Sequence, residues 1–126
     1  MASTKIDRNA GLKATTTTKI LDVIGKGCLL NISIIDPDAL AQNEFVKITI
    51  DDTVVLADTN GVDVPSTQTY MAIHDSILLD KPIVSTTELL RTNQKVPFHR
   101  HLQVAYKRAA AGTAGLTINI EYELKG

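Results

Sequence analysis

The hydrophobic and polar positions of this chain alternate at the spacing of β-strands. The clearest stretch covers residues 116–124, where every second residue from Leu116 to Leu124 is apolar or aromatic and the residues between them are polar. Because successive side chains of a strand point to opposite faces of a sheet, this alternation predicts one buried and one solvated face. Further strand-like runs cover residues 20–24, 28–35, 46–50, 53–57, 62–64, 69–74, 77–79 and 96–107.

Turn-forming residues separate these runs. The acidic pair at residues 51–52 predicts a tight hairpin between the β-branched runs on either side of it. The segment 108–115 is rich in alanine and glycine, so it predicts a flexible hairpin tip that joins the last two strands.

The number and spacing of the runs predict a single all-β domain. About seven or eight short strands, with turns at short intervals and no run long enough for a crossover helix, favour an antiparallel β-sandwich of the jelly-roll type over residues 18–126. Residues 1–17 are polar without a sustained period, which predicts a flexible N-terminal arm, or an edge segment that needs a neighbour to order it. Residues 80–95 have no clear period, and residues 86–91 within them fit either one helical turn or a loop.

The composition is that of a globular domain with few aromatic rings. The chain has 126 residues, of which 44% are hydrophobic, so one domain with a full core is expected. Only 4% are aromatic and none is tryptophan, so valine, isoleucine and leucine must build that core. The formal net charge is -1, which indicates neither nucleic acid nor an anionic membrane as a partner. No apolar run approaches the roughly 18 residues of a membrane span, and the N-terminus lacks the apolar stretch of a signal peptide.

The single cysteine, Cys28, lies within an apolar run. One cysteine cannot form an internal disulfide, so we expect a small buried side chain in a protein made in a reducing cytosol. Its apolar neighbours offer neither activation nor access for a nucleophile. The sequence also contains no nucleophile elbow, phosphate loop or dinucleotide fingerprint, so we expect neither an enzyme nor a cofactor.

His99 and His101 form the most suggestive short motif. If residues 96–107 are one strand, both imidazoles project from one face, about 6.5 Å apart. Two imidazoles can contribute to a zinc, nickel or iron site, but the remaining ligands must come from another strand or from a symmetry-related chain. The alternative is a polar outer face on a strand whose inner face carries Phe98 and Leu102, and we assign no metal site from the pair alone.

Arg100 interrupts the apolar face of the same predicted strand. Strict alternation places Arg100 beside Phe98 and Leu102, where an unpaired buried guanidinium would be too costly. The strand therefore bulges there, or Arg100 meets a carboxylate, or that end of the face is open. We favour a strand end or a subunit interface at Arg100.

Two patterns bear on ligand binding. Residues 58–63 place oxygen-bearing side chains around Gly61 as calcium loops do, but the register differs from an EF-hand and no bidentate Glu follows at the closing position. We therefore favour an ordinary Asn-Gly turn over a calcium loop. Sugar-binding sandwiches stack ligands on exposed aromatic side chains. Tyr106 and Tyr122 lie on predicted core faces, which leaves Tyr70 as the tyrosine available for such a contact.

The layout of residues 18–124 resembles that of small virion-associated proteins of tailed phages. Three stretches carry the resemblance: Gly25-Lys26-Gly27-Cys28-Leu29-Leu30, Val46-Lys47-Ile48-Thr49-Ile50-Asp51-Asp52, and residues 98–106. The resemblance implies a β-sandwich that assembles as a ring or trimer within a tail, baseplate or head. It carries over no functional residue.

The leading hypothesis is a structural assembly protein of a phage particle. Such a protein would be made in the host cytoplasm and would join the virion through contacts with copies of itself and with other virion proteins. The alternative is a β-sandwich module that binds a surface ligand or a glycan, for which Tyr70, His74 and residues 58–63 are the first candidates. A small metal-dependent enzyme ranks last, because only His99 and His101 support it.

Overall fold

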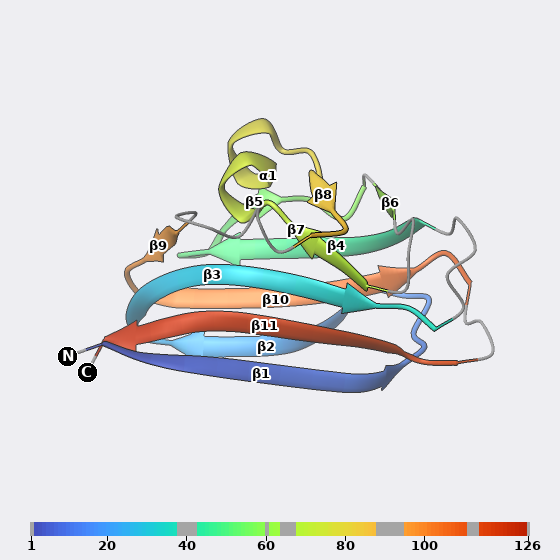
Figure 1. The fold of residues 1–126 in the computed structure, drawn as a ribbon. Coiled ribbons are helices and arrows are strands. Elements are labelled where there is room, and N and C mark those ends of the chain that lie inside the picture. The colour runs from blue at the N-terminus through green and yellow to red at the C-terminus, as the bar shows by residue number, and fades with distance from the viewer. Residues whose placement is uncertain are drawn as a thin grey trace.

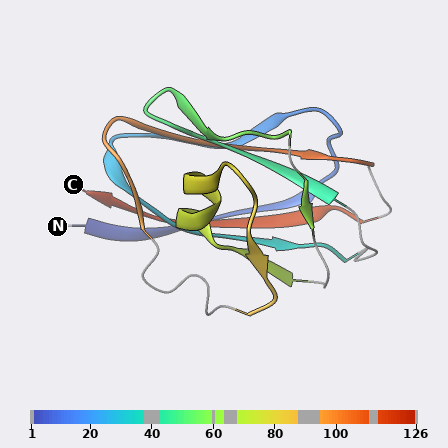
Figure 2. The ribbon, with the colours of Figure 1, turned by 90° about the horizontal axis from the view of Figure 1, so that it is seen from above.

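The protein is a sandwich of two antiparallel β-sheets (Figures 1 and 2). The computed structural model describes residues 2–37, 43–59, 61–63, 68–87, 95–110 and 114–125. Sheet A contains, in order, β1 (Ala2–Leu12), β11 (Leu116–Lys125), β3 (Lys26–Ile35), β7 (Gln68–Met71) and β8 (Val84–Ser85), with β9 (Val96–Phe98) also paired to β3. Sheet B contains β2 (Thr18–Ile24), β10 (His101–Arg108), β4 (Asn43–Ile50) and β5 (Thr53–Leu56), with β6 (Val62–Asp63) also paired to β4. The prediction of an all-β sandwich is confirmed.

The core lies between the sheets and is aliphatic, as the composition requires. On β10 and β11 every second side chain is buried over most of the strand, which confirms the alternation read from the sequence. Phe98 is the one phenylalanine among the fully buried side chains of the described residues. The remaining core positions are mostly Leu, Ile and Val from both sheets, including Leu29, Ile32, Ile34, Val46, Ile48, Leu56, Leu102, Val104, Leu116, Ile118 and Ile120.

The strands pair as a set of nested hairpins. The innermost pair is β4 with β5, followed outward by β3 with β7, β2 with β10 and β1 with β11, and all four pairs are antiparallel. Successive pairs belong alternately to sheet B and sheet A. The outermost pair therefore brings both termini to one end of the sandwich, where Ala2 lies opposite Lys125 (Figure 1).

The turn between β4 and β5 confirms the hairpin predicted from the acidic pair. Asp51 and Asp52 both have positive φ, 51° and 68°, as the tight turns that suit twisted strands require. Aspartate tolerates this conformation better than most residues, which explains two consecutive acids at this place.

The N-terminal segment is not a flexible arm. Residues 2–12 form strand β1, which pairs with β11 along the edge of sheet A. The register shifts between Asn9 and Leu12, where Gly11 has a φ of 68°. The alternative of an edge segment ordered by a neighbour is correct, and the neighbour is the C-terminal strand.

The predicted strand at residues 96–107 is two strands in different sheets. β9 pairs with β3 in sheet A, whereas β10 pairs with β2 and β4 in sheet B, and a bend at residues 99–100 carries the chain across. The predicted final hairpin is also wrong, because β10 and β11 lie in opposite sheets. The alternation of apolar and polar residues does not reveal this crossing, because the even-numbered residues are the buried ones in both β9 and β10.

The predicted strand at residues 77–79 is part of a helix. β7 ends at Met71, and α1 (Ile73–Leu79) follows, with Ile73 and Ser76 buried on one side of the helix. The Ser76 hydroxyl accepts a hydrogen bond from the Ile83 backbone N–H at 2.9 Å, which ties the helix to the next segment. Among the described residues no helix is long and apolar enough to cross a membrane. Residues 88–91 of the predicted turn or loop lie outside the described residues.

Candidate functional site

A network of three aspartates surrounds the bend at which the chain crosses between the sheets. The Asp51 carboxylate accepts hydrogen bonds from the backbone N–H groups of His99, Arg100 and His101, at 3.1, 2.7 and 3.0 Å. Partial desolvation alone would raise the pKa of Asp51, but these three donors outweigh it and hold the pKa below its usual value. Asp51 therefore fixes the bend, which explains how the two sheets can share one continuous chain here.

The histidine pair does not share a strand face. His99 lies in the bend, whereas His101 begins β10 and its ring lies between two carboxylates. Nε2 of His101 contacts Asp22, and Nδ1 lies 3.4 Å from Asp52. The hydrogen bond to Asp22 raises the pKa of His101, partial desolvation opposes the rise, and Asp52 adds to it. Within the described residues, no three His, Cys, Asp or Glu side chains gather in a group that could hold a metal ion.

Arg100 is exposed at the outside of the bend. Its Nη2 donates to the Asp51 backbone carbonyl at 3.2 Å and lies 3.5 Å from Asp52. The guanidinium therefore lies near a carboxylate, and Arg100 lies at a strand end. Both were among the outcomes expected from the sequence. A subunit contact at Arg100 stays a prediction.

The remaining sequence candidates are separate from one another. His74 is exposed on α1, with Nδ1 3.7 Å from Asp75. The possible calcium loop includes residue 60, which lies outside the described residues, and the Asp58 carboxylate accepts a hydrogen bond from the Thr17 hydroxyl. Cys28 is a free, half-buried thiol on β3.

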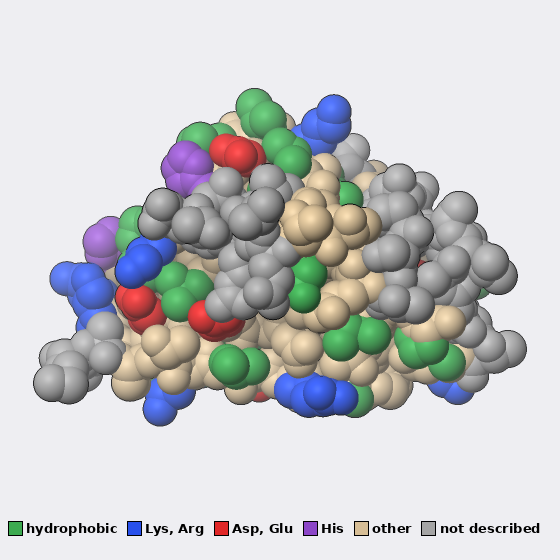
Figure 3. All heavy atoms as spheres, viewed as in Figure 1, with side chains coloured by type: hydrophobic (Ala, Val, Ile, Leu, Met, Phe, Trp, Pro, Cys, Tyr) green, Lys and Arg blue, Asp and Glu red, His purple; other side chains and the backbone are tan. Residues whose placement is uncertain are grey.

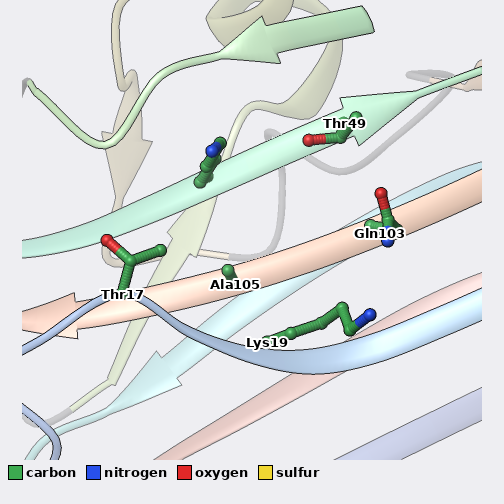
Figure 4. Close-up of a pocket in the computed structure, with 6 residues that line it drawn as sticks. Thr17, Lys19, Thr49, Gln103 and Ala105 are labelled. Atoms are coloured by element: carbon green, nitrogen blue, oxygen red, sulfur yellow. The ribbon is translucent and has the colours of Figure 1, made fainter. Parts of the chain in front are cut away.

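A shallow hollow of about 220 Å³ lies on the outer face of sheet B. Figure 4 shows that its labelled side chains come from β2, β4, β10 and the segment before β2. Thr17, Lys19 and Gln103 are spread along these strands and do not converge on one point (Figure 4). Lys19 Nζ is already 2.8 Å from the Asp22 carboxylate. The hollow is therefore a weaker candidate for a ligand site.

A polar groove of about 300 Å³ lies on the outer face of sheet A. Four strands supply its lining: Ile6 and Arg8 from β1, Asn119 and Glu121 from β11, Asn31 and Ser33 from β3, and Gln68 and Tyr70 from β7. The strand registers place these side chains in two rows across the sheet, one of Ile6, Glu121 and Asn31 and one of Arg8, Asn119, Ser33 and Tyr70. Figure 3, which looks onto this side of the molecule, shows acidic, basic and hydrophobic groups interspersed among other polar surface.

The floor of the groove is polar and almost closed to solvent. Asn31 and Ser33 are each only 5% exposed, although they point away from the aliphatic core. Within the described part of the chain, the Oδ1 atom of Asn31 has no hydrogen-bond partner. A buried amide oxygen without a partner is uncommon in folded proteins, so it marks the groove as a place where a ligand could bind. Of these residues only Tyr70 was a sequence candidate. The signal that could have found Asn31 and Ser33 is their alternation with isoleucine in the run 28–35.

A buried charge cluster lies at the end of the sandwich away from the termini. Arg108, Asp36 and Glu44 are each 1% exposed. Arg108 Nε lies 3.4 Å from Glu44 Oε2, and Nη2 lies 3.8 Å from Asp36 Oδ1. Arg108 Nη1 also donates to the backbone carbonyls of Leu12 and Ala114, at 3.3 and 2.9 Å. Arg108 thus contacts four segments at this end: the end of β1, the residue after β3, the start of β4 and Ala114 before β11. The sequence placed it at the start of a flexible loop.

One guanidinium faces two carboxylates in this cluster, so its charge balance depends on pH. Burial raises the pKa of Glu44 from 4.5 to about 7, Arg108 opposes the rise, and Asp36 adds to it. The folded protein therefore holds a proton on Glu44 at pH values where the unfolded chain has released it.

We expect the free energy of unfolding to fall as the pH rises from about 4.5 to 7, because the folded state loses the proton on Glu44 over this window. Glu44→Gln keeps the neutral side chain at every pH and should remove about 1–3 kcal/mol of this dependence. Urea denaturation of both proteins at several pH values measures the difference. The control is Glu123→Gln, at a half-buried glutamate that pairs with Lys95 and lies outside the cluster. Parallel curves for wild type and Glu44→Gln would contradict the expected proton uptake.

No protein-family model matches the chain, and no curated protein matches it. Function is therefore inferred from the features of the molecule itself.

Proposed function

We propose that this protein is a structural assembly component that joins a second copy of itself through strand β1. The observation that carries the proposal is the exposure of this strand. β1 is 11 residues long and pairs with β11 on one side, and no described strand pairs with its other side (Figure 1). None of its described side chains is buried. A long edge strand of this kind offers a row of backbone N–H and C=O groups to another strand.

The sequence of β1 is complementary to itself. When two copies pair antiparallel about a two-fold axis at Ile6, Lys5 of each copy lies opposite Asp7 of the other, and the two Ile6 side chains meet. Opposite charges directly across a strand pair contribute roughly 0.2–1 kcal/mol each. The pairing would also cover Ile6, which is 71% exposed in the single chain. A contact of this type uses the same surface on both subunits and closes as a dimer.

The nested pairing of the strands supports a jelly roll as the finer description of the fold. In a jelly roll, nested antiparallel strand pairs are distributed over two packed sheets. This fold recurs in viral capsid proteins and in lectins. With the resemblance to phage virion proteins, this supports a place in a tail, baseplate or head, in contact with other virion proteins. Because a fold does not by itself define a function, neighbouring genes for capsid, portal or tail proteins are the direct test of this placement.

A two-fold contact through β1 changes the oligomer expected from the resemblance. A trimer or a ring needs a head-to-tail contact between two different surfaces, whereas β1 pairs with itself. We therefore propose a dimer as the unit of assembly, made in the host cytoplasm before it joins the particle.

Light scattering on the purified protein should give twice the chain mass of 13.6 kDa. Lys5→Asp places two acids opposite each other in both halves of the contact, so the variant should become largely monomeric. The double variant Lys5→Asp with Asp7→Lys restores the opposite charges and should restore the dimer. Lys13→Asp, an exposed lysine outside β1, controls for net charge.

Two results would contradict this assembly. A wild-type protein that remains monomeric at high concentration has no such contact. A double variant that stays monomeric while retaining the wild-type circular dichroism and melting temperature would show that the proposed register is wrong.

A further inference from the structure

We propose that the polar groove on the outer face of sheet A binds a neutral saccharide. This site meets the assembly contact only at its rim, where β1 contributes Ile6 and Arg8 to the lining. The sugar contacts come from the face of β3, β7 and β11, whereas the assembly contact uses the free backbone edge of β1. Sugar binding in the groove is a second activity and does not require the dimer.

The floor of the groove supplies a hydrogen-bond acceptor that the protein does not use. Asn31 Oδ1 has no hydrogen-bond partner among the described residues, and Asn31 is only 5% exposed. An unpaired buried acceptor costs about 1–3 kcal/mol. A ligand hydroxyl that donates to this oxygen, after the Asn31 amide turns toward the groove, would recover that cost. Ser33, equally buried in the neighbouring row, adds a hydroxyl that can donate or accept.

The walls of the groove have the chemistry that recognises a sugar ring. Gln68 and Asn119 present planar amides, each of which can accept and donate at once, as a pair of adjacent sugar hydroxyls requires. Tyr70 is half-buried in the row of Asn119 and Ser33, and it provides an aromatic ring for the C–H face of a sugar.

The charges of the groove favour a neutral ligand over an anion. Arg8 and Glu121 lie on adjacent strands of the lining and carry opposite charges, so the groove has no net positive field to attract a phosphate or sulfate. Arg8 can still donate hydrogen bonds to hydroxyls. The volume of about 300 Å³ is at the lower end of small-molecule sites, which suits one or two sugar rings rather than a long chain.

The first experiment locates the ligand by NMR. The ¹⁵N-labelled full chain is titrated with a panel of neutral mono- and disaccharides, including glucose, galactose, mannose, N-acetylglucosamine, lactose and maltose, and separately with inorganic phosphate. We expect saturable shifts of backbone amides on β3, β7 and β11 for at least one sugar and none for phosphate. Shifts for phosphate alone, shifts confined to other surfaces, or no shifts with any sugar at tens of millimolar would overturn the proposal.

Variants then test the individual contacts with the sugar found by the titration. Asn31→Ala should weaken binding about five- to tenfold through the lost acceptor, and Tyr70→Ala about tenfold through the lost ring. Asn119→Ala, at a half-buried position, provides an independent test if Asn31→Ala fails to fold. Gln103→Ala in the hollow on sheet B is the matched control and should bind as wild type does. Unchanged affinity in Asn31→Ala or, where that variant does not fold, in Asn119→Ala would overturn the assignment of the groove.

Discussion

Replacing Arg108 with methionine is expected to lower the free energy of unfolding by about 3–5 kcal/mol. Above about pH 7, where Glu44 is also ionised, the substitution leaves the carboxylates of Asp36 and Glu44 in a buried site without their common cation. It also removes the donor to the carbonyl groups of Leu12, the last residue of β1, and Ala114, which precedes β11. Since whole domains are stable by only about 5–15 kcal/mol, this loss would be a large share of the total.

Chemical denaturation of Arg108→Met measures this loss, and Arg100→Met is the matched control. Arg100 is exposed and its ion pair with Asp52 lies at the surface, so its replacement should cost less than about 1 kcal/mol. A third variant combines Arg108→Met with Asp36→Leu and Glu44→Leu and should recover much of the stability, because all three charges are then absent. Equal costs for the two arginine variants would show that the buried cluster does not stabilise the fold.

Ile118→Asp is expected to destabilise the protein by several kcal/mol, because it places a carboxylate without a partner in the centre of the core. Ile118 is 1% exposed and lies opposite Ile34 on the neighbouring strand. Thr117→Asp, on the other face of the same strand, should have a small effect. Thermal melting by circular dichroism compares the two variants.

A conservative variant keeps this test informative if Ile118→Asp does not fold. Ile118→Val removes one buried methyl group and should cost about 0.5–1.5 kcal/mol. A melting temperature equal to that of the parent for Ile118→Asp would mean that β11 does not bury this face.

The sequence predicted the fold wherever the structure is determined by alternation. Leu116, Ile118 and Ile120 face the core because their strand lies over it, and the alternation of apolar and polar residues in the sequence records that arrangement directly. The chain crossing at residues 99–100 could not be predicted, because it depends on the Asp51 carboxylate about 50 positions earlier. β1 was missed for a related reason, since it pairs with β11 through its backbone and buries no described side chain of its own.

The candidate sites were less predictable than the fold. The groove joins side chains from four strands, and Arg8, Asn31 and Tyr70 become neighbours only once the order β1, β11, β3, β7 is known. Each of them alone is an ordinary polar residue on a strand. The buried position of Arg108 was also not predictable. The alanine- and glycine-rich segment that follows it suggests a mobile tip, and its buried partners Asp36 and Glu44 lie far away in the chain.

The adjacent termini determine how the domain would respond to mechanical force. Ala2 and Lys125 lie opposite each other at the open end of the β1–β11 pair. A force that pulls the two termini apart therefore acts across the strands, along the direction of the inter-strand hydrogen bonds. The hydrogen bonds between β1 and β11 would break one after another, starting at the termini, and β1 would separate from the sheet at low force. Tension in an assembly would be carried far better through the strand edges, where many bonds share the load in shear, than through attachments at the two ends of the chain.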